Sequence, residues 1–208
     1  MKRYRELFAF PQVTTLGISA FPARLAYGMI GLGIFFKAEQ ETGSVAIAGF
    51  AIGLNSLAGS LTAGIRGSVM DRWGQKWVIR ILVPAYSALI LTLNTMETSR
   101  SILITAFILG ITAPPINLSV RPLWKDLVPD SYLRTAYAFD SAMMSSTSVI
   151  GPVIVTSLAL SSRSFLALNV VAAFMFIGGI GLALTPVSRN WIPAKKVKDQ
   201  GNLFANRA

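Results

Sequence analysis

The sequence predicts an all-α polytopic membrane protein with six transmembrane helices. Hydrophobic residues make up 53% of its 208 residues and charged residues only 13%, whereas a soluble domain has about 25% charged residues. Six apolar stretches approach the length of about 20 residues that a helix needs to cross a bilayer. These stretches are continuous and do not alternate with polar residues, which argues against a β-barrel.

The predicted spans follow one another with short connections, and the first connection is expected to have about eight residues. A basic start with Lys2, Arg3 and Arg5 precedes the first span, and we interpret it as an uncleaved cytoplasmic N-terminus. The chain then divides into this N-terminus (1–13), a transmembrane bundle (14–185) and a basic cytoplasmic tail or start of an inter-domain linker (186–208). The predicted spans are 14–36, 45–66, 77–96, 101–120, 135–160 and 165–185.

The distribution of Lys and Arg predicts the orientation. With the N-terminus inside, 15 of the 19 basic residues fall on the inside, Arg24 lies in a span, and three fall outside, namely Lys37, Arg100 and Arg163. Loops rich in Lys and Arg stay in the cytoplasm. We therefore predict a multi-pass protein of the plasma (inner) membrane with both termini cytoplasmic. The net charge of +10 is spread over four membrane-edge segments, so nucleic-acid binding is not expected.

Few side chains are suited to enzyme chemistry. The chain has no His and no Cys, which removes the commonest general base and the thiolate metal ligands. The stretch GSVMDRWGQK lacks the G-K-[ST] ending of a phosphate-binding loop and any strand before it. We therefore predict no enzyme activity, no cofactor and no metal site.

Two charged residues fall inside predicted spans. Arg24 lies about ten residues into the first span and Asp140 about six residues into the fifth, roughly 15 and 9 Å deep at 1.5 Å per residue. A charge near the bilayer centre costs about 2.5–3.5 kcal/mol or more. Arg24 and Asp140 are therefore candidates to pair across a polar cavity, on a substrate or proton pathway or as a structural ion pair.

Two asparagines extend the list of pathway candidates. Asn55 and Asn117 lie within or close to spans. A polar side chain in such a place is more often an interhelical hydrogen bond than a ligand contact. Pro114 and Pro115 are expected to interrupt the fourth span and Pro152 the fifth, and such breaks often lie beside a cavity in transporters.

A motif between the second and third spans carries the most information. Its glycine and charged positions are Gly67, Asp71, Arg72, Gly74 and Lys76. Glycines permit a tight turn, and we expect these residues to form a short polar loop. The spacing G-x-x-x-D-R-x-G-x-K resembles the signature loop of the major facilitator superfamily. The resemblance implies a cytoplasmic gate, in which Asp71 pairs with a cation in one state. Arg121 and Asp126, at the end of the fourth span, are the expected partners.

The resemblance covers the whole chain but departs from the superfamily pattern at several positions. Gln75 stands where a basic residue is frequent, Ala106 stands where a buried Arg is expected, and Gly151-Pro152 matches only part of the antiporter motif. These departures argue against proton-coupled drug antiport. The tract RPLWKDLVP followed by YLRTAYAFDS is similar to bacterial efflux-type members.

A full facilitator has two six-helix bundles, and this chain resembles the N-terminal one. The resemblance implies efflux-type transport of a small molecule by alternating access, which needs a second bundle. That bundle would be a separate C-terminal half or a second copy of the chain. The alternative is a truncated or non-transporting membrane protein with an assembly or regulatory role. In a lone bundle we expect Arg24 and Asp140 to face lipid, so that the chain alone is unstable or associates.

Overall fold

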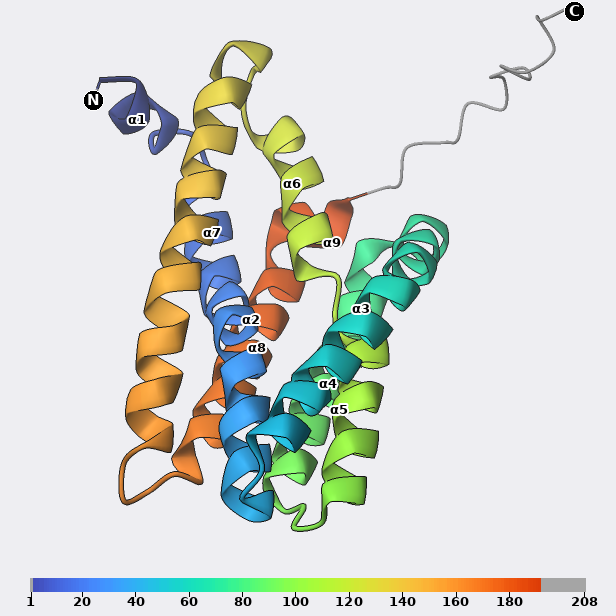
Figure 1. Cartoon of the computed structure of the whole chain (residues 1–208). Coiled ribbons are helices and arrows are strands. Elements are labelled where there is room, and N and C mark those ends of the chain that lie inside the picture. The colour runs from blue at the N-terminus through green and yellow to red at the C-terminus, as the bar shows by residue number, and fades with distance from the viewer. Residues whose placement is uncertain (1, 192–208) are drawn as a thin grey trace, which may run out of the picture.

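The computed structural model describes residues 2–191, and every regular element within them is a helix (Figure 1). Six segments are long and apolar enough to cross a membrane, which confirms the six predicted spans. Two short helices flank them, α1 (Lys2–Leu7) and α9 (Pro186–Asn190). The spans are α2 (Val13–Thr42), α3 (Val45–Trp73), α4 (Gln75–Asn94), the pair α5 (Ser99–Thr112) and α6 (Ile116–Leu127), α7 (Asp130–Ala159) and α8 (Leu166–Leu184).

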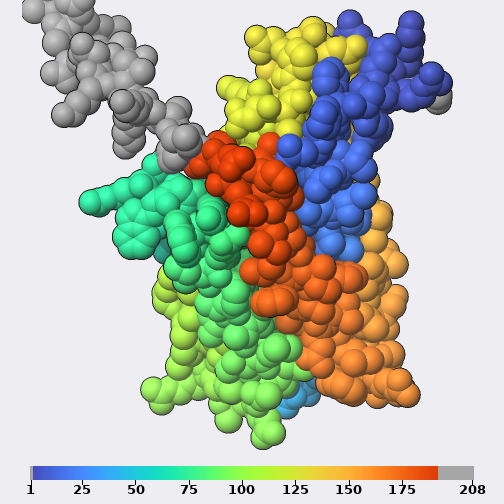
Figure 2. All heavy atoms as spheres, turned by 180° about the vertical axis from the view of Figure 1, so that it is seen from behind, coloured from blue at the N-terminus to red at the C-terminus, as the bar shows by residue number. Residues whose placement is uncertain are grey.

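The connections alternate between the two ends of the bundle. The α3–α4 junction, the α6–α7 turn, α1 and α9 lie at one end, and the other three connections lie at the opposite end (Figure 1). Figure 2 shows the reverse face, where α8 and α9 form an orange-to-red band between green α4 and the blue residues of α1 and α2. α8 packs against both α2 and α4 and so connects these two helices.

Local chemistry sets the first connection. Gly43 adopts φ 63° and its N–H donates to the carbonyl oxygen of Glu39 at 2.8 Å, which ends α2. The Oγ of Ser44 then accepts the N–H of Ile47 at 3.3 Å and caps α3. The predicted eight-residue connection is wrong, because α2 extends to Thr42 and only Gly43 and Ser44 separate the two helices.

The predicted polar loop is also wrong. α3 continues through Gly67, Asp71 and Arg72 to Trp73, and α4 begins at Gln75. Gly74 alone joins them, with φ 83° and with its N–H donating to the carbonyl oxygen of Met70 at 2.9 Å. Glycine is the residue that adopts such a φ without steric cost. The motif is therefore a one-residue joint between two helices.

The prolines differ in their effect on the spans. Pro114 and Pro115 break the fourth span into α5 and α6, as predicted. Pro152 does not interrupt the fifth span, contrary to the prediction, because α7 is one helix. A single proline removes one N–H donor from a helix, whereas two in succession remove two.

Glycines allow the backbones of α7 and α8 to contact the backbone of α2. A Cβ on Gly28 of α2 would lie 2.5 Å from the carbonyl oxygen of Thr147 in α7. A Cβ on Gly178 of α8 would lie 2.2 Å from the backbone nitrogen of Ala23 in α2. Both distances exclude a side chain, so α2, α7 and α8 depend on these glycines for the close packing that holds helices together in lipid.

Gly178→Ala is expected to destabilise the protein by about 1–3 kcal/mol, because its methyl group overlaps the backbone of Ala23. The measurement is the melting temperature of the full-length chain in detergent. Gly31→Ala in α2 is the matched control, since a Cβ at Gly31 meets no atom within 4 Å. Equal melting temperatures for the two variants would contradict the role of Gly178 in close packing.

Candidate functional site

Arg24 of α2 and Asp140 of α7 form an ion pair inside the bundle. The Nη1 of Arg24 lies 2.7 Å from the Oδ1 of Asp140. Trp124 of α6 donates its Nε1–H to the same oxygen at 3.1 Å. Arg24 is 3% exposed and Asp140 is fully buried. The first, fourth and fifth spans therefore meet at this pair.

This burial corrects the expectation that Arg24 and Asp140 face lipid in a lone bundle. The break at Pro114 and Pro115 is followed by α6, which packs against both α2 and α7. Trp124 of α6 is itself fully buried. A single bundle therefore encloses the pair, and the pair gives no reason for the chain alone to be unstable.

The pair leaves hydrogen-bonding capacity unused. Within residues 2–191, no group accepts from the Nε or Nη2 of Arg24, and none donates to the Oδ2 of Asp140. An unsatisfied buried polar group costs about 1–3 kcal/mol. The site therefore has two buried donor atoms and one buried acceptor available for further partners.

A second arginine binds the break in the fourth span. Arg66 of α3 donates through Nη1 to the carbonyl oxygens of Gly110 at 2.9 Å and Ala113 at 2.8 Å. It also donates through Nη2 to the carbonyl oxygen of Gly59 at 2.7 Å. Tyr27 of α2 donates its hydroxyl to the carbonyl oxygen of Pro114. Helix ends have carbonyls without helical partners, and these side chains supply donors to three carbonyls at the break after α5.

Arg66 ends the predicted second span (45–66) and is one of the 15 inside basic residues, and no contact was predicted for it. The signal is a pair of features, an Arg near the end of one apolar span and a Pro-Pro pair in another. A broken span inside a bundle needs donors for its freed carbonyls.

The two asparagines lie apart from the ion pair. Asn55 of α3 donates its Nδ2–H to the carbonyl oxygen of Ala106 in α5 at 2.9 Å and so joins two spans. Asn117 is exposed on α6. In the part of the chain that the structure describes, no hydrogen bond links either residue to Arg24 or Asp140.

The gate candidates lie at the same end of the bundle but are not joined by ion pairs. Asp71 and Arg72 are exposed at the end of α3, and Arg121 and Asp126 are exposed on α6. Among residues 2–191 the ion pairs are those of Arg24 with Asp140 and of Lys37 with Glu41. The structure therefore does not bring Asp71 to a cation. Lys76 lies with its Nζ 5.4 Å from the ring centroid of Trp77.

Gln75 ties the motif to α9. It is fully buried and donates its Nε2–H to the Oγ of Ser188 at 3.1 Å. A basic residue in this buried position would leave a charge without a counter-charge. The neutral Gln75 therefore suits the place where related sequences often have a basic residue.

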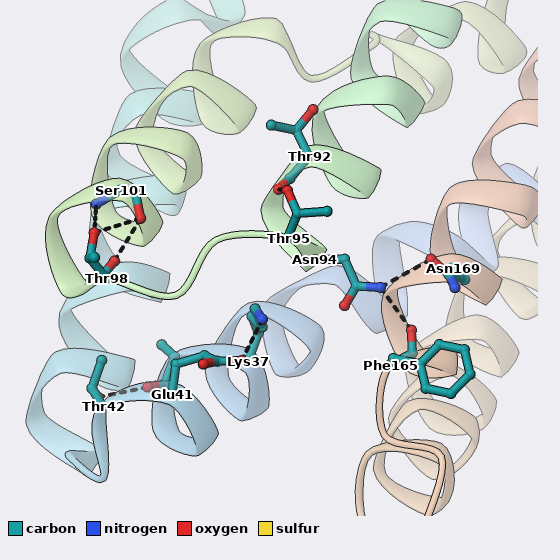
Figure 3. A network of polar contacts seen from close by, with 11 residues as sticks. Lys37, Glu41, Thr42, Thr92, Asn94, Thr95, Thr98, Ser101, Phe165 and Asn169 are labelled. Carbon is teal, nitrogen blue, oxygen red and sulfur yellow. Dashed lines mark hydrogen bonds and ion pairs between the residues drawn. The ribbon is translucent and has the colours of Figure 1, made fainter.

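The opposite end of the bundle has its own polar contacts (Figure 3). Lys37 pairs with Glu41 one turn further along α2, with 2.6 Å between Nζ and Oε1. Asn94 at the end of α4 donates to the carbonyl oxygen of Phe165 at 2.9 Å and to the Oδ1 of Asn169 at 3.1 Å. These two bonds fix the end of α4 to the start of α8.

A family profile described as Major Facilitator Superfamily matches residues 16–207. The chain belongs to the major facilitator superfamily. The uncharacterized MFS-type transporter y4rN of Sinorhizobium fredii is 27% identical over 191 residues, which cover 89% of this chain and 47% of that relative. The chain thus spans about half the length of this curated relative. No solved structure matches the chain.

Membership in the major facilitator superfamily confirms the resemblance that the motif around Asp71 indicated. It makes the chain a multi-pass membrane protein of a transporter family whose members are typically not enzymes. Among the described residues, no group of three or more His, Cys, Asp or Glu is placed to hold a metal ion.

Arg24→Met and Asp140→Leu are each expected to destabilise the bundle by about 3–5 kcal/mol, because each leaves the other charge buried without its partner. The double variant should recover most of that loss, since no charge then remains. The measurement is a double-mutant cycle on melting temperatures in detergent.

The more exposed outer pair supplies the control for this cycle. Glu41→Gln removes the partner of Lys37 and is expected to change stability by about 0–1 kcal/mol. Losses that simply add in the Arg24 and Asp140 double variant would mean that these two residues are not energetically coupled.

Proposed function

We propose that this chain forms the first of two six-helix bundles of a small-molecule transporter, and that the second bundle packs on α3 and α7. The observation that carries the proposal is the unequal burial of the spans. In each span we compare an apolar stretch of 18 residues. Only 17% of this stretch is buried inside the bundle in α3 and 22% in α7, against 39–50% in the other four spans. These two helices therefore keep most of their surface for contacts outside the bundle.

α3 presents two kinds of exposed surface. Leu57, Leu61 and Ile65 form a row of large apolar side chains, which is suited to lipid. A row of small residues runs beside it at steps of three or four positions, and small residues let helices approach closely in a membrane. The small row therefore supports a helical partner. Its members are Gly49, Gly53, Ser56, Ser60 and Gly64.

α7 has a similar row. Ala138, Ala142, Ser145 and Ser148 are exposed and recur at steps of four and three positions. α3 and α7 lie on either side of α2 (Figure 1), which packs against both of them. A second bundle on these two rows would lie across α2, the helix that carries Arg24. Rocking of one bundle against the other would then give alternating access.

The end of the bundle that holds the α3–α4 junction and the α6–α7 turn is called the basic end, because the inside basic residues among 2–191 gather there. Its exposed charges support a gate between the two bundles. Asp71, Arg72, Arg121 and Asp126 are exposed and form no ion pair within residues 2–191. In this proposal they pair with charges of the second bundle when the basic end closes. Gly74 is the joint that allows the end of α3 to turn relative to α4.

We assign the direction of transport from the tract at 121–141 and the location from the basic end. The tract resembles efflux-type members, so we assign export of the small molecule. The basic end would lie in the cytoplasm of a cell whose plasma (inner) membrane holds the bundle. Arg24 and Asp140 are assigned to the substrate or proton pathway, because they carry buried atoms with unused hydrogen-bonding capacity.

Photo-cross-linking in native membranes tests the second bundle. A benzoylphenylalanine at Ser56, on the small row, is expected to give a cross-linked protein product. The same probe at Leu57, which is 59% exposed on the large apolar row, is expected to give several-fold less. The mass of the product distinguishes a second copy from a separate half. Equal yields, or no product at either position, would favour the non-transporting alternative.

Cysteine labelling tests the orientation, since the chain has no Cys of its own. Ser131 lies in the first turn of α7, beside the α6–α7 turn, and Ser162 lies in the α7–α8 connection; both are exposed. A membrane-impermeant maleimide is expected to label Ser162→Cys in intact cells and Ser131→Cys only after permeabilisation. The reverse pattern would place the basic end outside.

A further inference from the structure

The ion pair uses only one nitrogen of the Arg24 guanidinium. Nη1 faces Asp140, whereas Nε and Nη2 are buried and have no acceptor within residues 2–191. On a planar guanidinium, the N–H of Nε and one N–H of Nη2 point in the same direction. This edge binds the two oxygens of a carboxylate or phosphate side by side. The edge of Arg24 that is best suited to an oxyanion therefore has no partner among residues 2–191.

The unused atoms are concentrated at this pair. Of the five buried side-chain atoms without a partner in the described residues, three belong to Arg24 and Asp140. The other two, on Gln75 and Ser87, belong to different residues of α4. The Nε and Nη2 donors of Arg24 and the Oδ2 acceptor of Asp140 are complementary to a ligand that has both an oxyanion and a hydrogen-bond donor.

We propose that the substrate is a small organic anion whose carboxylate or phosphate group binds the Nε and Nη2 edge of Arg24. A hydroxyl or ammonium group of the same molecule donates to the Oδ2 of Asp140. The assignment rests on the proposed transport function and names its substrate class. The oxyanion satisfies both free donors of Arg24 at once, which removes the cost of leaving them unbonded.

One bundle contains the whole of this site. Arg24, Asp140 and Trp124 come from α2, α7 and α6 of the same chain. Binding is therefore expected in the isolated chain, without the second bundle. Trp124 reports on the site, because its Nε1–H donates to the carboxylate that pairs with Arg24.

The test is a fluorescence titration of the full-length chain in detergent, with Trp73, Trp77 and Trp191 replaced by Phe so that Trp124 is the one tryptophan left. Sodium lactate and sodium phosphate are added at constant ionic strength. Lactamide is the neutral control for lactate, and sodium chloride is the control for an adventitious anion. A saturable change in Trp124 emission is expected with lactate or phosphate, which tells carboxylate from phosphate, and none with lactamide or chloride.

Arg24→Lys keeps the positive charge but lacks the bidentate edge. It is expected to weaken binding by at least about tenfold, or about 1.4 kcal/mol. Unchanged affinity in this variant, or an equal response to lactamide or chloride, would overturn the proposal.

The unsubstituted chain gives a check that does not depend on how variants fold. Lactate or phosphate is expected to raise its melting temperature saturably above the value in chloride, because a ligand that binds the folded state stabilises it. No rise with either anion would overturn the anion assignment. Cross-linking from Ser56 involves no ligand, so its success or failure judges the transporter proposal separately.

Discussion

Close approach of backbones holds this bundle together, and α2 is the helix on which these contacts converge. Helices in lipid gain little from burying apolar side chains, because the surrounding chains are equally apolar. α2 instead meets α7 through Gly28 and α8 through Ala23, where Gly178 leaves room for it. It also packs against α3 and α6. α2 also carries two polar side chains of the interior, Arg24, which pairs with Asp140, and Tyr27, which donates to the carbonyl oxygen of Pro114.

Two arginines of the bundle, the buried Arg24 and the half-buried Arg66, have different kinds of partner. Arg24 pairs with the carboxylate of Asp140, and its Nε and Nη2 have no hydrogen-bond acceptor within residues 2–191. Arg66 finds backbone carbonyls, which the Pro-Pro break has released from helical bonding, and its contacts fasten α3 to the end of α5. The first arrangement retains capacity for a ligand. The second is satisfied and serves structure.

The sequence predicted features that depend on the composition of a whole span, such as the number of spans. It did not predict features that depend on which helices lie side by side, such as side-chain burial and contacts. Hydropathy predicted six spans, because about 20 apolar residues are a strong signal. Polar residues near Asp71 suggested a loop, yet nothing breaks the helix before Gly74. The depth of Arg24 and Asp140 suggested a pair. Their burial was missed, because it depends on where α6 goes after Pro114 and Pro115. The contacts of Arg66 were missed because they depend on α3 lying beside the end of α5.

The separation of Arg24 from its partner has a consequence for biogenesis. Asp140 follows Arg24 by 116 positions in the chain. At about 5–20 residues per second, the ribosome takes roughly 6–23 s to synthesise that interval. During this time the first span exists with its arginine but without the counter-charge. The ion pair of α2 is therefore completed only once the fifth span has been made, well after α2 itself.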